Sequence, residues 1–177
     1  MIVIAMVSVV GALAARIYSR GVRGEAAPAF ARSLLSTIME ARHAALSMGR
    51  ASRVTMVPGT STLGSRLVVD QWEPSTSSWV TQMTTAVPSG VRLCGPDASV
   101  QLGAVTPTCP LTSGMSNTVC FSSSGRVNVT GSPTGCPTTA TSTATGATLY
   151  FVTTGGDKKY RVVIWGLTGM AKLMDTW

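Results

Sequence analysis

The chain opens with MIVIAMVSVVGALAA (Met1–Ala15), an apolar run without charge that ends at Arg16. As a helix, such a run rises about 22 Å at 1.5 Å per residue, which is short of the roughly 30 Å hydrocarbon core of a bilayer. The run is therefore either the core of a signal peptide, with a candidate cleavage site at residues 12–14, or a membrane helix that lacks its beginning. It lacks the basic residues that normally precede a signal-peptide core.

The helical pattern continues well beyond this run, which argues against a cleaved signal. Apolar residues recur at three- and four-residue spacing at Phe30, Leu34, Ile38, Ala41, Ala45 and Met48. This spacing predicts a helix that is apolar on one face, and Gly49 is typical of a helix end. Pro28 predicts a kink or break near Ala26 to Pro28.

After Gly49 the apolar residues switch to the spacing of strands, in short runs separated by Pro, Gly, Ser and Thr. The predicted strands lie near Arg53–Val57, Ser65–Asp70, Ser78–Met83, Asn117–Ser122, Gly125–Thr130, Thr148–Thr153, Tyr160–Trp165 and Met170–Met174. Gly155-Gly156-Asp157 predicts the turn of a hairpin between Leu149–Thr154 and Lys159–Trp165, because glycine accepts positive φ. The sequence thus predicts an α+β fold, a long helix packed on an antiparallel sheet.

The predicted organisation has two parts. Residues 1–27 form the hydrophobic half of the helix, and residues 28–177 form the head. The head contains the amphipathic half-helix 28–49 and a β-rich domain 53–177. Within that domain, a stretch at about 88–146 is rich in Thr, Ser, Gly and Pro, which predicts an irregular surface insertion.

Four cysteines, Cys94, Cys109, Cys120 and Cys136, all fall in the second half of the chain. No pair is spaced as C-x-x-C, so disulfides in an oxidising compartment are favoured over a zinc site. Four cysteines allow three pairings, and the sequence leaves these open; sequential pairing would close two short loops.

Charge and composition give no catalytic centre. The net charge is +7, and much of the basicity lies in the first third, beside the apolar run, which indicates contact with anionic lipid or acidic neighbours. His43 is the single histidine and is expected at the helix surface, so no catalytic triad can be built. Asp70 and Glu73 flank Trp72 and are interpreted as a solvated strand end. We therefore predict no enzymatic activity, and no catalytic, cofactor-binding or metal-binding residues.

Four segments, in order along the chain, resemble one family. Met1–Ala15 is similar to the interior of the type IV pilin N-terminal helix, and EARHAALSMGRASRVTM (Glu40–Met56) resembles the A-R-x-x-A-L-x-x-G-x-x-V-T-L stretch of the GspH/FimT family of pseudopilins and minor pilins. FSSSGRV (Phe121–Val127) is similar to its F-x-x-x-G-R strand. Thr148–Leu173 is similar to its C-terminal hairpin and final strand. The resemblance implies a pilin-like head on a membrane and assembly helix.

The resemblance also implies which residues assemble. The membrane and assembly residues would be Met1, Ile2, Val3, Ile4, Ala5, Met6, Val7, Val9, Val10 and Leu13. Mature pilins of this class carry a Glu at their fifth position, and this Glu and the leader peptidase site are absent here. We therefore expect the native protein to begin several residues upstream of Met1.

Some members of the family resemble DNA receptors with a basic G-R-x-R-type motif in the last strand. The matching stretch here is Gly169–Lys172, where Lys172 alone keeps a charge, with Lys158, Lys159 and Arg161 nearby in the hairpin. Phosphate contacts supply most non-specific affinity, so the loss of the motif's arginines should weaken DNA binding. DNA binding through these residues is therefore the minor alternative.

The function implied is structural: a minor pilin or pseudopilin at the tip or initiation complex of a type IV pilus or a type II secretion pseudopilus. The head would lie in the periplasm, anchored in the inner membrane, or outside the cell in a pilus. Its partners would be other pilins through the N-terminal helix, membrane lipid before assembly, and an adhesin or secreted substrate at the tip. A secreted, disulfide-bonded binding module is the alternative of a different class. The choice between the two machines stays open.

Overall fold

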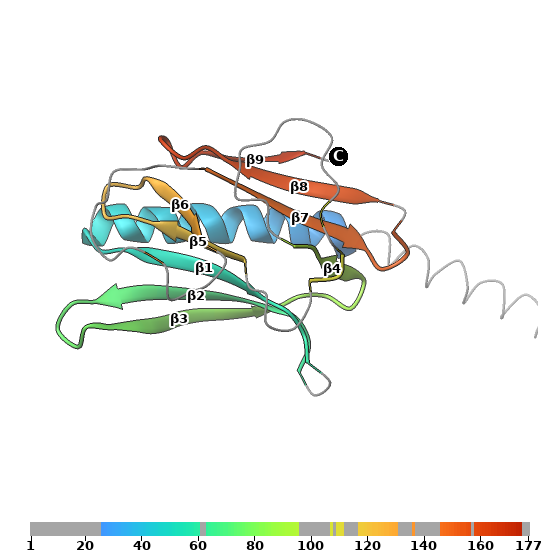
Figure 1. The fold of residues 1–177 in the computed structure, drawn as a ribbon, viewed down its shortest axis with the longest axis horizontal. Helices are drawn as coiled ribbons and strands as arrows, with labels where there is room; N and C mark the ends of the chain where they lie inside the picture. Colours follow the sequence, from blue (N-terminus) through green and yellow to red (C-terminus); the bar gives the residue numbers. More distant parts are fainter. Residues whose placement is uncertain are drawn as a thin grey trace, which may run out of the picture.

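The computed structural model describes residues 26–60, 63–95, 107, 109–111, 117–130, 136, 146–156 and 158–174. Within these residues, one helix packs on strands that pair in antiparallel fashion into two sheets (Figure 1). This is the α+β fold that the sequence predicts. The predicted membrane and assembly residues, Met1 to Leu13, lie outside the described part of the chain. No helix within the described part is long and apolar enough to cross a bilayer.

The helix covers residues 26–48 and buries one face against the sheets. The buried residues follow the three- and four-residue spacing of the sequence: Ala27, Phe30, Ala31, Leu34, Ile38, Ala41 and Ala45. At the end of the helix, Gly49 has a φ of 63°, and the Arg50 amide donates a hydrogen bond to the Ala45 carbonyl (3.2 Å). This bond is that of a Schellman motif, which needs a residue that accepts positive φ. Gly49 therefore ends the helix, as predicted.

One expectation about this helix is corrected. Met48 was expected on the buried face, but its side chain is 59% exposed. The reason is that the last turn reaches the rim of the sheet, where Gln71 Nε2 donates to the Met48 sulfur (3.0 Å). The described helix begins at residue 26, so the kink or break predicted near Ala26 to Pro28 lies at the border of the described residues and stays a prediction.

The five-stranded sheet has the order β3-β2-β1-β5-β6. Its strands are β1 (Ser52–Val57), β2 (Arg66–Glu73), β3 (Ser78–Ala86), β5 (Asn117–Phe121) and β6 (Val127–Thr130). Val54 of β1 stands between Val69 of β2 and Val119 of β5 in the ladder, and these three side chains face the helix. The next residues along each strand face outward, because side chains alternate across a sheet.

The four-stranded sheet has the order β4-β7-β8-β9. Its strands are β4 (Val91–Leu93), β7 (Ala147–Thr153), β8 (Lys159–Ile164) and β9 (Ala171–Met174). The predicted hairpin joins β7 to β8, with Gly156 at a φ of 77° in the turn and the Thr153 amide bonded to the Lys158 carbonyl (3.0 Å). Asp157, the third residue of the predicted turn, lies outside the described residues.

All eight predicted strands are present, whereas β4 was missed. β4 is only three residues long and lies within the stretch predicted as an irregular insertion. Its place in the sheet is fixed by pairing with β7, more than fifty residues further along the chain, in which Arg92 lies opposite Val152. A local sequence pattern carries no signal of such a distant pairing.

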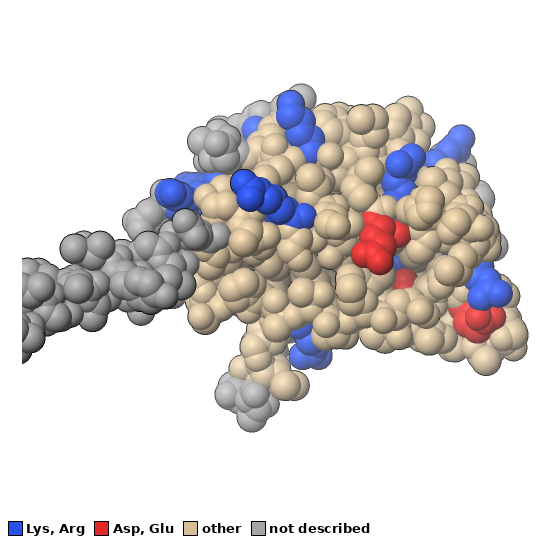
Figure 2. Space-filling view, turned by 180° about the vertical axis from the view of Figure 1, so that it is seen from behind, with Lys and Arg blue, Asp and Glu red and all other residues tan. Residues whose placement is uncertain are grey.

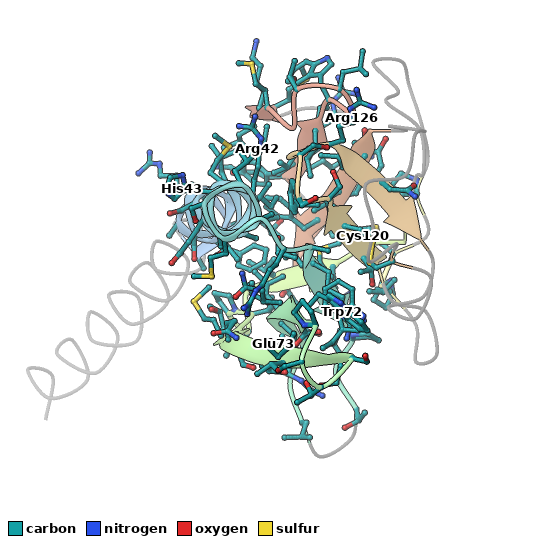
Figure 3. All side chains as sticks on the ribbon, turned by 90° about the vertical axis from the view of Figure 1, so that its left-hand side faces the viewer. Arg42, His43, Trp72, Glu73, Cys120 and Arg126 are labelled. Atoms are coloured by element: carbon teal, nitrogen blue, oxygen red, sulfur yellow. A yellow bond between two sulfur atoms is a disulfide. The ribbon has the colours of Figure 1, made fainter. Side chains whose placement is uncertain are left out.

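The core lies between the helix and the two sheets. Phe151 of β7 is fully buried at its centre, with its ring 5.3 Å from that of Phe30 in an edge-on contact and 5.4 Å from that of Tyr160 in a stacked contact. Ser52 Oγ donates a hydrogen bond to the Ala41 carbonyl (2.6 Å) and so ties β1 to the helix. Figure 3 shows that both sheets lie on the same side of the helix, so the other side faces away from the core.

Candidate functional site

The two disulfides join Cys94 to Cys109 and Cys120 to Cys136. This is the sequential pairing among the three that the sequence left open. Cys94 directly follows β4, and Cys120 lies within β5, on the outward side of the five-stranded sheet next to Arg53 of β1. The Cα atoms lie 4.4 Å apart in the first pair and 5.6 Å apart in the second. Each disulfide therefore ties a later segment of the chain to one of the sheets.

The basic residues of the C-terminal hairpin meet on the outer face of the four-stranded sheet. Lys159 and Arg161 lie two residues apart on β8, and Lys172 of β9 stands opposite Val163, the next residue on that face. Arg92 of β4 joins them, because it and Lys159 are both paired with Val152 of β7. We call this surface the basic face and define it by Arg92, Lys159, Arg161 and Lys172. Lys158 is exposed in the adjoining turn.

The basic face carries no acidic residue on its four strands. A shallow cavity of about 350 Å³ opens at one end of it, lined by Arg92, Lys159 and the turn glycines. Tyr150 lies on β7, between β4 and β8. It is fully buried, so it offers no open ring on which a base could stack. The sequence reasoning missed Arg92 because it missed β4.

Asp70 and Glu73 were expected to form a solvated strand end. For Asp70 this expectation is wrong. Asp70 is 5% exposed, and its Oδ2 lies 2.7 Å from Arg53 Nε. Its other oxygen accepts a hydrogen bond from Thr81 Oγ1 (2.7 Å). Both partners are its cross-strand neighbours on β1 and β3, which the sequence could not place beside it.

Arg53 also lies over the Trp79 ring, with its guanidinium carbon 4.3 Å from the ring centroid. The Trp79 ring in turn contacts Trp72 edge-on, with centroids 5.5 Å apart. This stack covers the Arg53 and Asp70 ion pair from one side, and both tryptophans are half-buried. These contacts indicate that Trp72 and Trp79 serve packing on the sheet.

Glu73 differs from Asp70 in its exposure. Its Oε2 lies 2.5 Å from Arg50 Nη1, and 31% of its side chain is exposed. The pKa of Glu73 is lowered from its ordinary value, chiefly by hydrogen bonds from the side chain and the backbone amide of Ser75, with a smaller contribution from Arg50. Figure 3 shows Glu73 and Trp72 well apart from Arg126, which lies next to the opposite edge strand.

The last titratable residue that the sequence singled out, His43, lies apart from these pairs. His43 is exposed on the side of the helix that faces away from both sheets, as predicted (Figure 3). Within the described ranges, no three His, Cys, Asp or Glu side chains come close enough together to hold a metal ion.

A long helix packed lengthwise on antiparallel sheets defines a pilin-like fold. Two solved structures share it, both of the minor pseudopilin EpsH from the type II secretion system of Vibrio cholerae. One is 17% identical with a TM-score of 0.50 and covers 84% of this chain and 95% of its own. The other is 16% identical with a TM-score of 0.52 and covers 85% and 96%. The chain thus has the GspH-like pilin fold that the sequence motifs predict. No protein-family model and no curated protein sequence matches it.

Proposed function

We propose that the chain is a minor pilin or pseudopilin that joins other pilin-like subunits through its N-terminal helix. The observation that carries this proposal is the pilin-like head with its helix at residues 26–48. In the sequence, this helix is preceded by the uncharged run Met1–Ala15 and by a short segment that contains Arg16, Arg20 and Arg23. EpsH, which shares the fold, is a minor pseudopilin of a type II secretion system. The run would be held in the inner membrane and would then pack among the like helices of other subunits.

The exposed side of the helix supports this role. The sheets occupy one side only, so the helix can lie against neighbours along its other side. Arg32, Ser36 and His43 are exposed there and leave the head soluble before assembly. The head would lie in the periplasm, where the two disulfides are stable. Proposed partners at the tip are an adhesin or a secreted substrate.

Val7→Arg tests the anchoring role of the apolar run. An arginine near the middle of a membrane helix costs about 2.5–3.5 kcal/mol of insertion free energy. We therefore expect the variant to leave the membrane fraction and to be lost from sheared filaments. The matched control is Ser36→Arg, which adds the same charge on the exposed side of the head helix. Retention of Val7→Arg in both fractions at the level of the control would contradict the proposal.

A second candidate function, DNA binding at a pilus tip, is favoured by one observation: the strand register brings Arg92, Lys159 and Lys172 onto one face. If phosphates bind there, log K falls with log salt, and each removed charge reduces the steepness of that fall by about 1. Filter binding of double-stranded DNA by Lys159→Ala and Lys172→Ala measures this slope. Arg32→Ala, an exposed charge on the helix, is the control. Absence of salt-dependent binding by the unmodified chain would end this candidate.

A further inference from the structure

The edge strand β3 differs from the other strands that end the two sheets. β3 is nine residues long, whereas the edge strands β4, β6 and β9 have three, four and four residues. Its sequence SWVTQMTTA contains no charged residue and no proline. Natural proteins usually protect an edge by making it short, charged or interrupted by proline, since its unpaired backbone groups can bind another strand. Among the described edges, β3 is thus the one open to strand addition.

Only part of the usual protection is present on β3. The pairing with β2 shifts register between Val69 and Asp70, which leaves Gln82 outside the ladder. Such a bulge bends an edge locally, but β3 is regularly paired on both sides of it. Both faces of the strand are largely accessible, with no residue of β3 buried. Figure 1 shows β3 along one border of the molecule, away from the four-stranded sheet.

An apolar groove lies directly inside this edge. It has a volume of about 310 Å³ and is lined on the helix side by Ala41, Ala44 and Met48, and on the sheet side by Val69 and Met83. A strand added beside β3 would place every second side chain on the inner face of the sheet, at the opening of this groove.

The charge at the groove indicates what the added strand carries. Glu40 lies at its helix side, is exposed, and forms no ion pair within the described part of the chain. The acidic residues of β2, in contrast, are paired with Arg50 and Arg53. Few acidic side chains are visible on the helix side of this basic protein (Figure 2). A lysine or arginine of the partner would complement Glu40.

A second copy of the chain fits this surface poorly. Pairing of β3 with β3 of another copy would bring no basic residue to Glu40, because β3 has none. It would also bring together two chains that each carry a net charge of +7. The occupant is therefore a different protein.

We propose that β3 binds an extended segment of a partner protein by strand addition. The segment is apolar at the alternate positions that face the groove and carries a basic residue that pairs with Glu40. Backbone hydrogen bonds to β3 supply affinity, and the groove and Glu40 supply specificity. This surface lies on the head, so the proposal does not depend on the role of the N-terminal helix.

Binding of a labelled peptide to the full chain in detergent tests the proposal. The probe is acetyl-Thr-Val-Thr-Lys-Thr-Val-Thr-Val-Thr-amide with a fluorophore, in which the lysine and the valines share one face. Its matched probe carries N-methyl groups on alternate amides, which removes donors along one side. We expect saturable binding that weakens at least tenfold with the methylated probe. Glu40→Lys should weaken binding at least tenfold, whereas the control His43→Lys, on the same helix but facing away from the sheets, should not change it.

Two adjacent proline variants, Thr84→Pro and Thr85→Pro, locate the binding edge. Backbone amides of neighbouring strand residues point to opposite sides, so one variant removes a donor to β2 and the other a donor at the free edge. We expect one of the two to keep its unfolding midpoint and lose peptide binding. The proposal is overturned if the peptide does not bind at millimolar concentration, if methylation or Glu40→Lys has no effect, or if the chain forms a dimer that one of the prolines dissociates.

Discussion

Phe151→Ala is expected to lower the free energy of unfolding of the head by about 3–5 kcal/mol. Phe151 is fully buried and contacts both Phe30 of the helix and Tyr160 of β8. Its removal leaves a cavity at the point where the helix meets the four-stranded sheet. Two ring contacts are lost in addition to the buried area. The free energy is measured by denaturant unfolding of the full chain in detergent, followed by tryptophan fluorescence.

Leu167→Ala is the control for this variant. Leu167 is 76% exposed in the turn before β9, so its truncation should change the free energy by no more than about 0.5 kcal/mol. A loss below about 1 kcal/mol for Phe151→Ala would show that the helix does not pack on the four-stranded sheet through this residue.

Asp70→Ala is expected to lower the free energy of unfolding by about 3–5 kcal/mol, because it leaves the guanidinium of Arg53 without its carboxylate. The Arg53 side chain is 13% exposed, so water can replace the lost partner only in part. Thr81 loses its acceptor at the same time. The same denaturant measurement gives the value.

Glu73→Ala is the matched comparison, because Glu73 lies on the same strand and is also paired with an arginine. Exposed ion pairs contribute little, since solvent screens them. We therefore expect a much smaller loss than for Asp70→Ala. Equal losses for the two variants would contradict the assignment of Asp70 as the buried one of these two carboxylates.

The helix and most strands could be predicted because their signals are local. The helix face follows from the spacing of Phe30, Leu34, Ile38 and Ala41, and its end follows from Gly49, which takes the positive φ that the last turn requires. The hairpin of β7 and β8 follows in the same way from its turn glycines. Neither needs knowledge of distant parts of the chain.

The rest depends on contacts between distant segments. Asp70 looked solvated in the sequence, and only the pairing of β2 with β1 and β3 brings Arg53 and Thr81 to its carboxylate. Arg92 joined the basic face only through the pairing of β4 with β7. The free edge of β3 follows from the strand order, which the sequence did not provide. Met48 was placed on the buried face because periodicity does not say where the sheet under a helix ends.

The location and intact mass of the native protein test most directly whether the chain is an anchored pilin-like subunit. Cells that express the native gene are separated into membrane and soluble fractions, and the protein from each is weighed by mass spectrometry. We predict that it is found in the inner membrane fraction and that its mass includes Met1–Ala15. A soluble product that begins at Ala15 would contradict this and would identify a secreted binding module instead.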